Sequence, residues 1–296
     1  MCEKVKFVNT FSIYSLCSYF FFHYFLLQKL ENLTELNFDN CQLLTRMPDV
    51  SDIPNLEKLS FEGCNRLIAL HDSIGFLNKL TLLKAQSCTK LRRFPPLNLP
   101  SLEILELSFC SSLENFPEIL GKTGKIKKLR LVILPMIKEL PVSFQNLTGL
   151  QELRINDFDQ LNSSVLTPEL TYFTVDGCKE WKWVNSKDGE GVGSTVASNL
   201  LSCCFFSCNL NDDFCSAGFM QLTKVMRLIL WEANITFLPE CIKEFHHLDD
   251  LDVIFCERLE EIRGVPPNLK AFRAIDCTSL TSSGSSILLN QVLPCF

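Results

Sequence analysis

The sequence predicts an α/β solenoid, in which short repeats stack one on the next, and three observations lead to this fold class. An apolar frame recurs along most of the 296 residues, as at positions 56–67, 102–113 and 248–259. Its period lies within the range of about 20–29 residues that is typical of leucine-rich repeats, and its form is L-x-x-L-x-L-x-x-[N/C]-x-L. One such repeat cannot bury its apolar face alone, so the repeats must stack into a solenoid.

Ten repeats can be phased by their first apolar position. Successive starts lie 20 to 24 residues apart, except for one gap of 55 residues between Leu170 and Val225. Because 55 residues equal one repeat plus about 30 more, the gap predicts an insertion. The ten starts are Leu33, Leu56, Leu80, Leu102, Ile126, Leu150, Leu170, Val225, Leu248 and Leu269.

The frame also predicts a strand in each repeat. In L-x-x-L-x-L the last two apolar residues are two positions apart, so on a strand both point to one face. That face enters the solenoid core, and the residues between and beside them point outward. We therefore expect a curved parallel sheet on the concave side of the solenoid. The expected inward residues include Leu59, Phe61, Leu105, Leu107, Leu251 and Val253.

After the strand the chain must turn inward, and cysteine occupies the turn position in seven of the ten repeats. A thiol is small, readily buried and a weak hydrogen-bond donor, so it suits this slot. Sulfurs that are one repeat apart lie beyond bonding distance, which predicts reduced, buried thiols and a reducing compartment. The seven slot cysteines are Cys41, Cys64, Cys88, Cys110, Cys178, Cys256 and Cys277.

The second half of the repeats predicts short helices and irregular segments on the convex side. Several repeats place a proline after an apolar residue, and proline suits the first turn of a helix. Apolar residues three or four apart follow at positions 73–77, 143–147 and 241–245, which indicates one or two helical turns with one buried face.

The chain divides into four predicted parts. Residues 1–29 are an apolar N-terminal segment, residues 30–184 are repeats, residues 185–222 are an insertion loop, and residues 223–296 are repeats and the C-terminal end. The run 7–27 approaches the length of a membrane span, about 20 residues. Three interpretations stay open for it: a signal or anchor, a disrupted earlier repeat, or non-native sequence from an imperfect gene model.

Composition and motifs argue against catalysis and nucleic-acid binding. The net charge is −6 and the pI is about 5.4, whereas nucleic-acid binding needs a basic face. The sequence has no phosphate-binding loop, and residue order supports no catalytic triad. The insertion carries Cys203, Cys204, Cys208 and Cys215, but their spacing matches no usual zinc-ligand pair. We therefore predict no enzyme activity, no cofactor and no metal.

The outward strand residues form the candidate binding surface, and the hypothesis is that it recognises protein. Aromatic and arginine side chains are the usual energetic anchors of protein interfaces. Tyr172 and Trp231 are predicted to flank the insertion, and the middle rows are basic. The predicted anchors are Lys128, Arg130, Arg154, Tyr172, Arg227 and Trp231.

Several runs resemble one family closely: LEKLSFEGC (56–64), LELSFCSSL (105–113), LPECI (238–242) and PPNLK (266–270). They look like the C-terminal leucine-rich repeats of plant intracellular immune receptors, in the class that carries a Toll/interleukin-receptor domain and a nucleotide-binding switch domain. The resemblance covers residues 30–292. It implies a cytoplasmic module that senses a pathogen effector, directly or through a guarded host protein, and that contacts the switch domain.

The chain departs from this family in having neither a nucleotide-binding motif nor a Toll/interleukin-receptor domain, so ATP binding and NAD cleavage are not carried over. The alternative is a secreted or membrane-anchored repeat receptor or inhibitor, with membrane contact only if residues 7–27 are an anchor. The extracellular plant class usually carries L-x-G-x-I-P, which these repeats lack. The slot cysteines also suit the cytosolic class.

Overall fold

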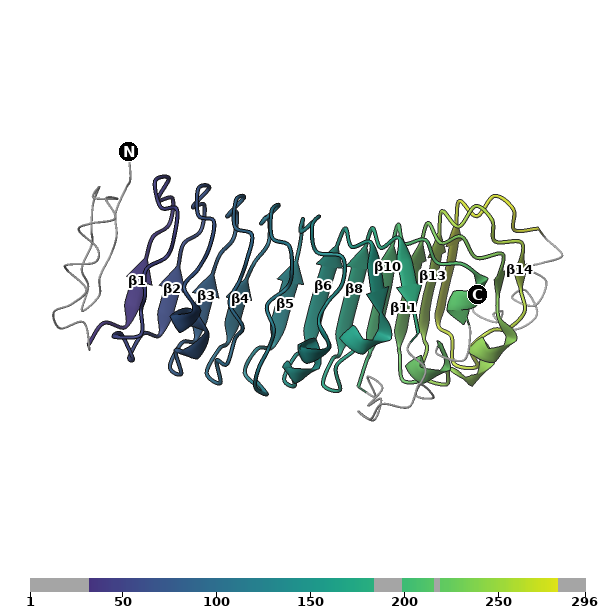
Figure 1. The fold of residues 1–296 in the computed structure, drawn as a ribbon. Coiled ribbons are helices and arrows are strands. Elements are labelled where there is room, and N and C mark those ends of the chain that lie inside the picture. The colour runs from purple at the N-terminus through teal and green to yellow at the C-terminus, as the bar shows by residue number, and fades with distance from the viewer. Residues whose placement is uncertain (1–31, 184–198, 216–218, 282–296) are drawn as a thin grey trace. The chain divides into compact units, whose positions relative to one another are not determined.

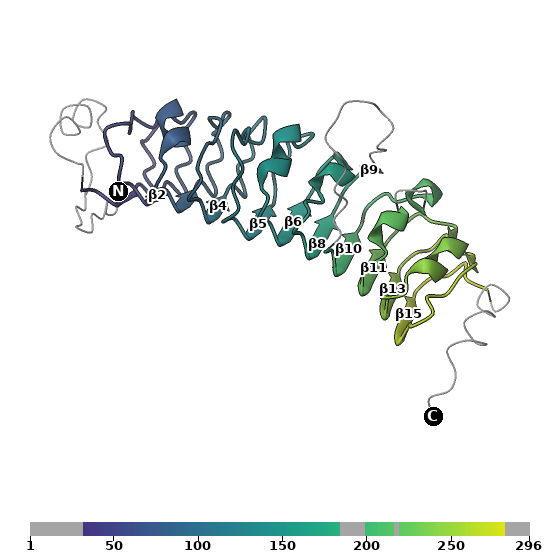
Figure 2. The same cartoon turned by 90° about the horizontal axis from the view of Figure 1, so that it is seen from below.

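The computed structural model describes residues 32–183, 199–215 and 219–281. These residues fall into two compact units, one ending at Leu150 and one beginning at Gln151. Within each unit, parallel strands lie along one side, and short helices and irregular segments lie along the other (Figures 1 and 2). The predicted leucine-rich-repeat solenoid is thus confirmed. The predicted boundaries at 184 and 222 do not coincide with the division between the units.

The first unit contributes one short strand per repeat. Strands β1 to β4 form a four-stranded parallel sheet in sequence order. Leu36, Leu59, Leu83 and Leu105 are aligned across it, and each is at most 2% exposed. The elements are β1 (Glu35–Asn37), β2 (Lys58–Ser60), η1 (Asp72–Phe76), β3 (Leu82–Lys84), β4 (Ile104–Glu106), β5 (Lys128–Leu131) and η2 (Val142–Asn146).

In the second unit, β6, β8, β10, β11, β13 and β15 pair in parallel in that order. Two short pairs, β7 with β9 and β12 with β14, follow the main strands. The elements are β6 (Glu152–Asn156), β7 (Gln160–Asn162), η3 (Ser163–Val165), β8 (Tyr172–Asp176), β9 (Glu180–Lys182), β10 (Ser202–Phe206), η4 (Asp212–Cys215), η5 (Phe219–Leu222), β11 (Arg227–Trp231), β12 (Phe237–Leu238), η6 (Glu240–Glu244), β13 (Asp250–Ile254), β14 (Glu261–Ile262) and β15 (Ala271–Ile275).

The prediction of an insertion loop over residues 185–222 is wrong for the part that contains β10. This strand pairs with β8 on one side and β11 on the other, so it is the strand of a further repeat. Leu200, Cys203 and Phe205 are buried where the frame expects leucines, and Cys208 is buried in the slot. The 55-residue gap therefore divides into spacings of 30 and 25 residues. Cysteine at the second apolar position packs as a small hydrophobe, which hid the repeat.

Two predicted segments lie partly or wholly outside the residues that the structure describes. The N-terminal segment 1–29 and residues 185–198 of the predicted insertion lie outside the described residues. Within the described ranges, the structure contains no helix that is long and apolar enough to cross a membrane.

The predicted helical turns are present, but all helices in the described ranges are 3-10 helices. Helices η1, η2 and η6 each begin one residue before the predicted pattern. Pro141 and Pro239 hold extended backbone at the caps of η2 and η6. At η1 the His71 ring instead accepts from the Ser73 backbone N–H. Such short helices let each repeat close within its period.

A left-handed residue precedes the slot in every described repeat. In the left-handed region only glycine is free of steric cost, and asparagine and aspartate tolerate it better than branched residues. Only two of these eleven positions are glycine, and one is Ile133, with φ 53°. The eleven residues are Asn40, Gly63, Ser87, Phe109, Ile133, Asp157, Gly177, Ser207, Glu232, Phe255 and Asp276.

The slot thiols link successive repeats. Six of the eight slot thiols, counting Cys208, donate to the backbone carbonyl of the second inward residue of the preceding repeat, as Cys88 Sγ does to Phe61 O over 3.0 Å. The same bond joins Cys64 to Phe38, Cys110 to Ala85, Cys208 to Val175, Cys256 to Leu230 and Cys277 to Val253. A buried carbonyl without a donor would be costly, so a weak donor in this place stabilises the turn. Cys178 differs, since it donates to Glu180 O.

We predict that the buried slot thiols react slowly with iodoacetamide in the native chain and rapidly after unfolding. The slot residue Cys277 is half-buried, which corrects the expectation that all slot thiols are buried, and it should react faster than the others. Burial raises the pKa of Cys178 to about 11 and that of Cys208 to about 12, so little reactive thiolate forms at neutral pH. Site-by-site mass spectrometry measures the labelling, with the half-buried Cys241 as the internal reference. Disulfides between slot cysteines, or labelling of the buried slot thiols as fast as that of Cys241, would contradict the assignment.

We predict that Leu105→Ala lowers the free energy of unfolding by about 2–5 kcal/mol, because it leaves a cavity between stacked repeats. Leu105 is 2% exposed, whereas Leu120 is 56% exposed and gives the matched control. Leu120→Ala should change the stability by less than about 0.5 kcal/mol. Equal denaturation curves for the two variants would show that the inward phasing is wrong.

Candidate protein-binding surface

The outward residues of the second unit form three rows, at the first, third and fifth positions of each strand. Strand pairing sets their register, and β10 adds a member to each row that the sequence-based phasing missed. From β8 to β15 the first row is Tyr172, Ser202, Arg227, Asp250 and Ala271; the third is Thr174, Cys204, Ile229, Asp252 and Arg273; the fifth is Asp176, Phe206, Trp231, Ile254 and Ile275.

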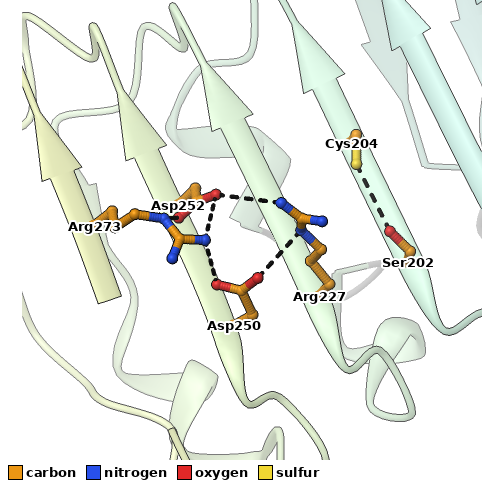
Figure 3. Close-up of polar contacts among 6 residues, drawn as sticks. All are labelled: Ser202, Cys204, Arg227, Asp250, Asp252 and Arg273. Atoms are coloured by element: carbon orange, nitrogen blue, oxygen red, sulfur yellow. Dashed lines mark hydrogen bonds and ion pairs between the residues drawn. The ribbon is translucent and has the colours of Figure 1, made fainter. Parts of the chain in front are cut away.

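An ion-pair network joins three neighbouring strands on this face (Figure 3). Arg227 on β11 contacts Asp250 (Nε to Oδ2, 3.2 Å) and Asp252 (Nη2 to Oδ2, 3.9 Å) on β13. From β15, Arg273 contacts Asp250 (Nη2 to Oδ1, 2.6 Å) and Asp252 (Nε to Oδ1, 2.5 Å). The two guanidinium groups therefore neutralise the two carboxylates.

Burial makes Asp252 the centre of this network. Its side chain is 5% exposed, whereas those of Arg227 and Arg273 are 51% and 43% exposed. A buried carboxylate is costly unless it is paired and hydrogen-bonded. The Asp252 carboxylate and the neighbouring Asp250 in turn raise the pKa of Arg273. The network thus fixes β11, β13 and β15 in register.

The structure places the six predicted anchors in different settings. Arg227 belongs to the network, and Arg154 pairs with Glu152 (Nε to Oε1, 2.9 Å) on its own strand. Tyr172 is 54% exposed. Trp231 lies in the fifth row, at the opposite end of the strands from Tyr172. Strand β10 lies between the strands that carry these two residues.

Lys128 and Arg130 belong to the first unit, where they are exposed outward residues of β5. Neighbouring outward residues of that unit form ion pairs: Lys58 with Glu35 at 3.8 Å and Lys84 with Glu106 at 3.2 Å. Lys128 and Arg130 are further basic residues of the first unit's strand face.

Three of the four cysteines weighed as zinc ligands have other places in the fold. Cys203 points inward into the core and Cys208 fills the slot. Cys204 follows Cys203 on the strand and so points to the opposite face, with its Sγ 3.7 Å from Ser202 Oγ. Burial raises the pKa of the Cys204 thiol. Adjacent residues on opposite faces cannot hold one ion together, and the described residues contain no cluster of metal-ligating side chains.

The fifth row carries an aromatic cluster that alternation alone does not reveal. The rings of Phe206 and Trp231 have centroids 6.2 Å apart, and those of Trp231 and Phe255 are 5.1 Å apart. Phe255 is not a strand residue: it occupies the left-handed position after β13. Phe206 on β10 and Phe255 in the turn after β13 therefore lie on either side of Trp231 on β11.

Parallel strands with a repeating inward frame, a slot after each strand and short helices on the other side define a leucine-rich-repeat protein. Residues 98–285 match the family described as disease resistance protein RPS4B-like, leucine-rich repeats. The chain belongs to this family, which confirms the resemblance seen in the sequence. The match indicates no catalytic family.

Individual proteins with similar sequences are also plant resistance proteins. The chain is 38% identical to disease resistance protein RPP4 of Arabidopsis thaliana, over 75% of this chain and 19% of RPP4. It is 27% identical to TMV resistance protein N of Nicotiana glutinosa, over 84% of this chain and 26% of that protein. The chain thus spans about a quarter or less of their length. A solved leucine-rich repeat domain, that of the type III effector XopL, has a TM-score of 0.49 at 20% identity over 84% of this chain and 79% of its own.

We predict that Asp252→Ala lowers the free energy of unfolding by about 1–3 kcal/mol, because it removes the buried one of the two carboxylates that Arg227 and Arg273 share. The matched control is Glu261→Ala, which breaks an exposed pair with Arg263 (2.7 Å). An exposed pair contributes about 0–1 kcal/mol. Urea denaturation of both variants compares the two losses. If Asp252→Ala lowers the free energy of unfolding no more than Glu261→Ala does, the network does not stabilise the fold.

Proposed function

We propose that this chain is the recognition and regulatory repeat module of a plant disease-resistance receptor and that it binds protein through its strand faces. The observation that carries the proposal is the mixture of side chains on these faces. Exposed Tyr172, a row of aromatic rings and basic Lys128 and Arg130 stand on rigid parallel strands. Rigid aromatic and basic side chains are typical anchors of protein interfaces.

The proposed partner is a pathogen effector, a guarded host protein or a nucleotide-binding switch domain. Family membership supports this choice, and the net charge of −6 disfavours nucleic acid. We place the module in the cytoplasm, because its slot thiols act as hydrogen-bond donors and so need the reduced state. The role is binding, without catalysis or a cofactor.

A co-precipitation experiment tests the proposal with the switch domain of a related resistance protein. We predict that the double variant Lys128→Glu, Arg130→Glu binds about tenfold or more weakly than the parent chain, and that its binding depends less on salt. Salt screens exposed charges at an interface, so the parent contact should weaken as ionic strength rises.

Lys90→Glu is the matched control, since Lys90 is exposed in the turn after slot residue Cys88 and lies off the strand face. It should bind as the parent does. Equal binding by the double variant and the parent would remove the strand face of the first unit from the interface. Absence of binding to any effector, host protein or switch domain tried would contradict the function itself.

A further inference from the structure

The carboxyl-terminal edge of the strand face in the second unit has an unusual composition, and we call it the aromatic edge. It comprises the fifth-row residues and the left-handed residues that follow them. Phe206, Trp231 and Phe255 form a chain of contacting rings, and Phe255 is 38% exposed. Ile275 adds an aliphatic side chain that is 44% exposed, whereas Ile254 is buried. The edge therefore offers partly exposed aromatic rings and one exposed aliphatic side chain.

Acidic residues lie along the same edge as these rings. The edge contains four acidic residues and no basic one. Its members are Asn156, Asp157, Asp176, Gly177, Phe206, Ser207, Trp231, Glu232, Ile254, Phe255, Ile275 and Asp276. In the part of the chain that the structure describes, none of the four carboxylates forms an ion pair. By contrast, arginines neutralise Asp250 and Asp252 elsewhere on the same face.

Glu232 is held against the central ring. Its Oε2 accepts from Ser207 Oγ at 2.8 Å, and its Oε1 accepts from Trp231 Nε1 at 3.3 Å. Both donors are neutral, so these bonds fix the position of the carboxylate without pairing it with a cation. A carboxylate and an indole ring thus lie side by side at the surface before any partner arrives.

The electrostatic potential at the aromatic edge is negative. Partial burial raises the pKa of Asp176, and the charges of Asp157 and Glu232 raise it further, whereas a hydrogen bond from Asn156 lowers it. The faces of aromatic rings also carry negative potential. A cation placed here would interact favourably with the rings and the carboxylates at once.

We propose that the aromatic edge binds a cationic segment of a protein partner, with one arginine guanidinium stacked on Trp231 and paired with Glu232. The inference rests on the proposed function and narrows it to a partner of this chemistry. Arginine fits better than lysine, because its planar group can stack on a ring while its edge hydrogen-bonds to a carboxylate. The exposed Ile275 would contact apolar side chains that flank the arginine.

The test uses the full chain and a synthetic probe, acetyl-(Gly-Arg-Leu)3-amide, in isothermal titration calorimetry. A second peptide replaces each arginine by citrulline, which keeps the shape and removes the charge. We predict that the arginine peptide binds at least about tenfold more tightly than the citrulline peptide, because uncharged citrulline can form neither the cation–π interaction nor the ion pair. A lysine peptide should lie between the two.

Variants of the chain locate the site. Trp231→Ala should weaken the arginine peptide about fivefold or more, whereas Trp231→Phe, which keeps a ring, should retain most of the affinity. Glu232→Gln should weaken it about threefold and reduce its salt dependence. Glu257→Gln is the matched control, because Glu257 is exposed and lies outside the edge. Melting temperatures of all four variants would show whether each is folded.

Equal binding of the arginine and citrulline peptides would overturn the inference, as would unchanged binding after both Trp231→Ala and Glu232→Gln. These results are distinct from failure of the proposed function. If a partner protein binds but the arginine peptide does not, the function stands and the inference falls. If the peptide binds at the edge while no partner protein is captured, the arginine-binding site stands, but the proposed function falls and the protein partner falls with it.

Discussion

Stacking of inward side chains between successive repeats is the interaction on which this structure depends. Each strand is only two to five residues long, too short to be stable alone. The two inward residues of a repeat become fully buried only when the next repeat covers them, as for Leu59 and Phe61. The parallel register follows from this packing, because a shift of one residue would expose both. The outward rows are consequently aligned across strands, and only aligned rows can form a network or an aromatic edge.

The sequence was a reliable guide wherever a repeat kept its frame. Inward leucines, slot cysteines and the short helical turns were all predictable, because each depends on spacing within one repeat. The repeat that contains β10 is not predictable from the frame, because Cys203 occupies a position where the frame has leucine. The left-handed backbone positions are not predictable from residue type, because nine of the eleven residues there are not glycine. At these positions stacking and hydrogen bonds between repeats outweigh the local preference of residues such as Ile133.

The surface was predictable only in part, for a related reason. Alternation along a strand indicates which side chains point outward, and it identified Arg227 and Trp231. It does not show that Arg227 meets Asp250 and Asp252, because these lie a full repeat away and are brought into contact by register. Phe255 contacts Trp231 only because its backbone turns left-handed after the strand. Properties shared between repeats therefore required the structure.

The slot thiols give the stack a direction. In every bond of this kind the donor sulfur belongs to the later repeat and the acceptor carbonyl to the one before it, as with Cys64 and Phe38 or Cys277 and Val253. A chain that leaves the ribosome amino end first would therefore present each acceptor before its donor is made. Each new repeat could close on a finished surface, one repeat at a time, without waiting for the rest of the polypeptide. Assembly during synthesis would then proceed by local steps, and the chain would expose at most one uncovered apolar face at its growing end.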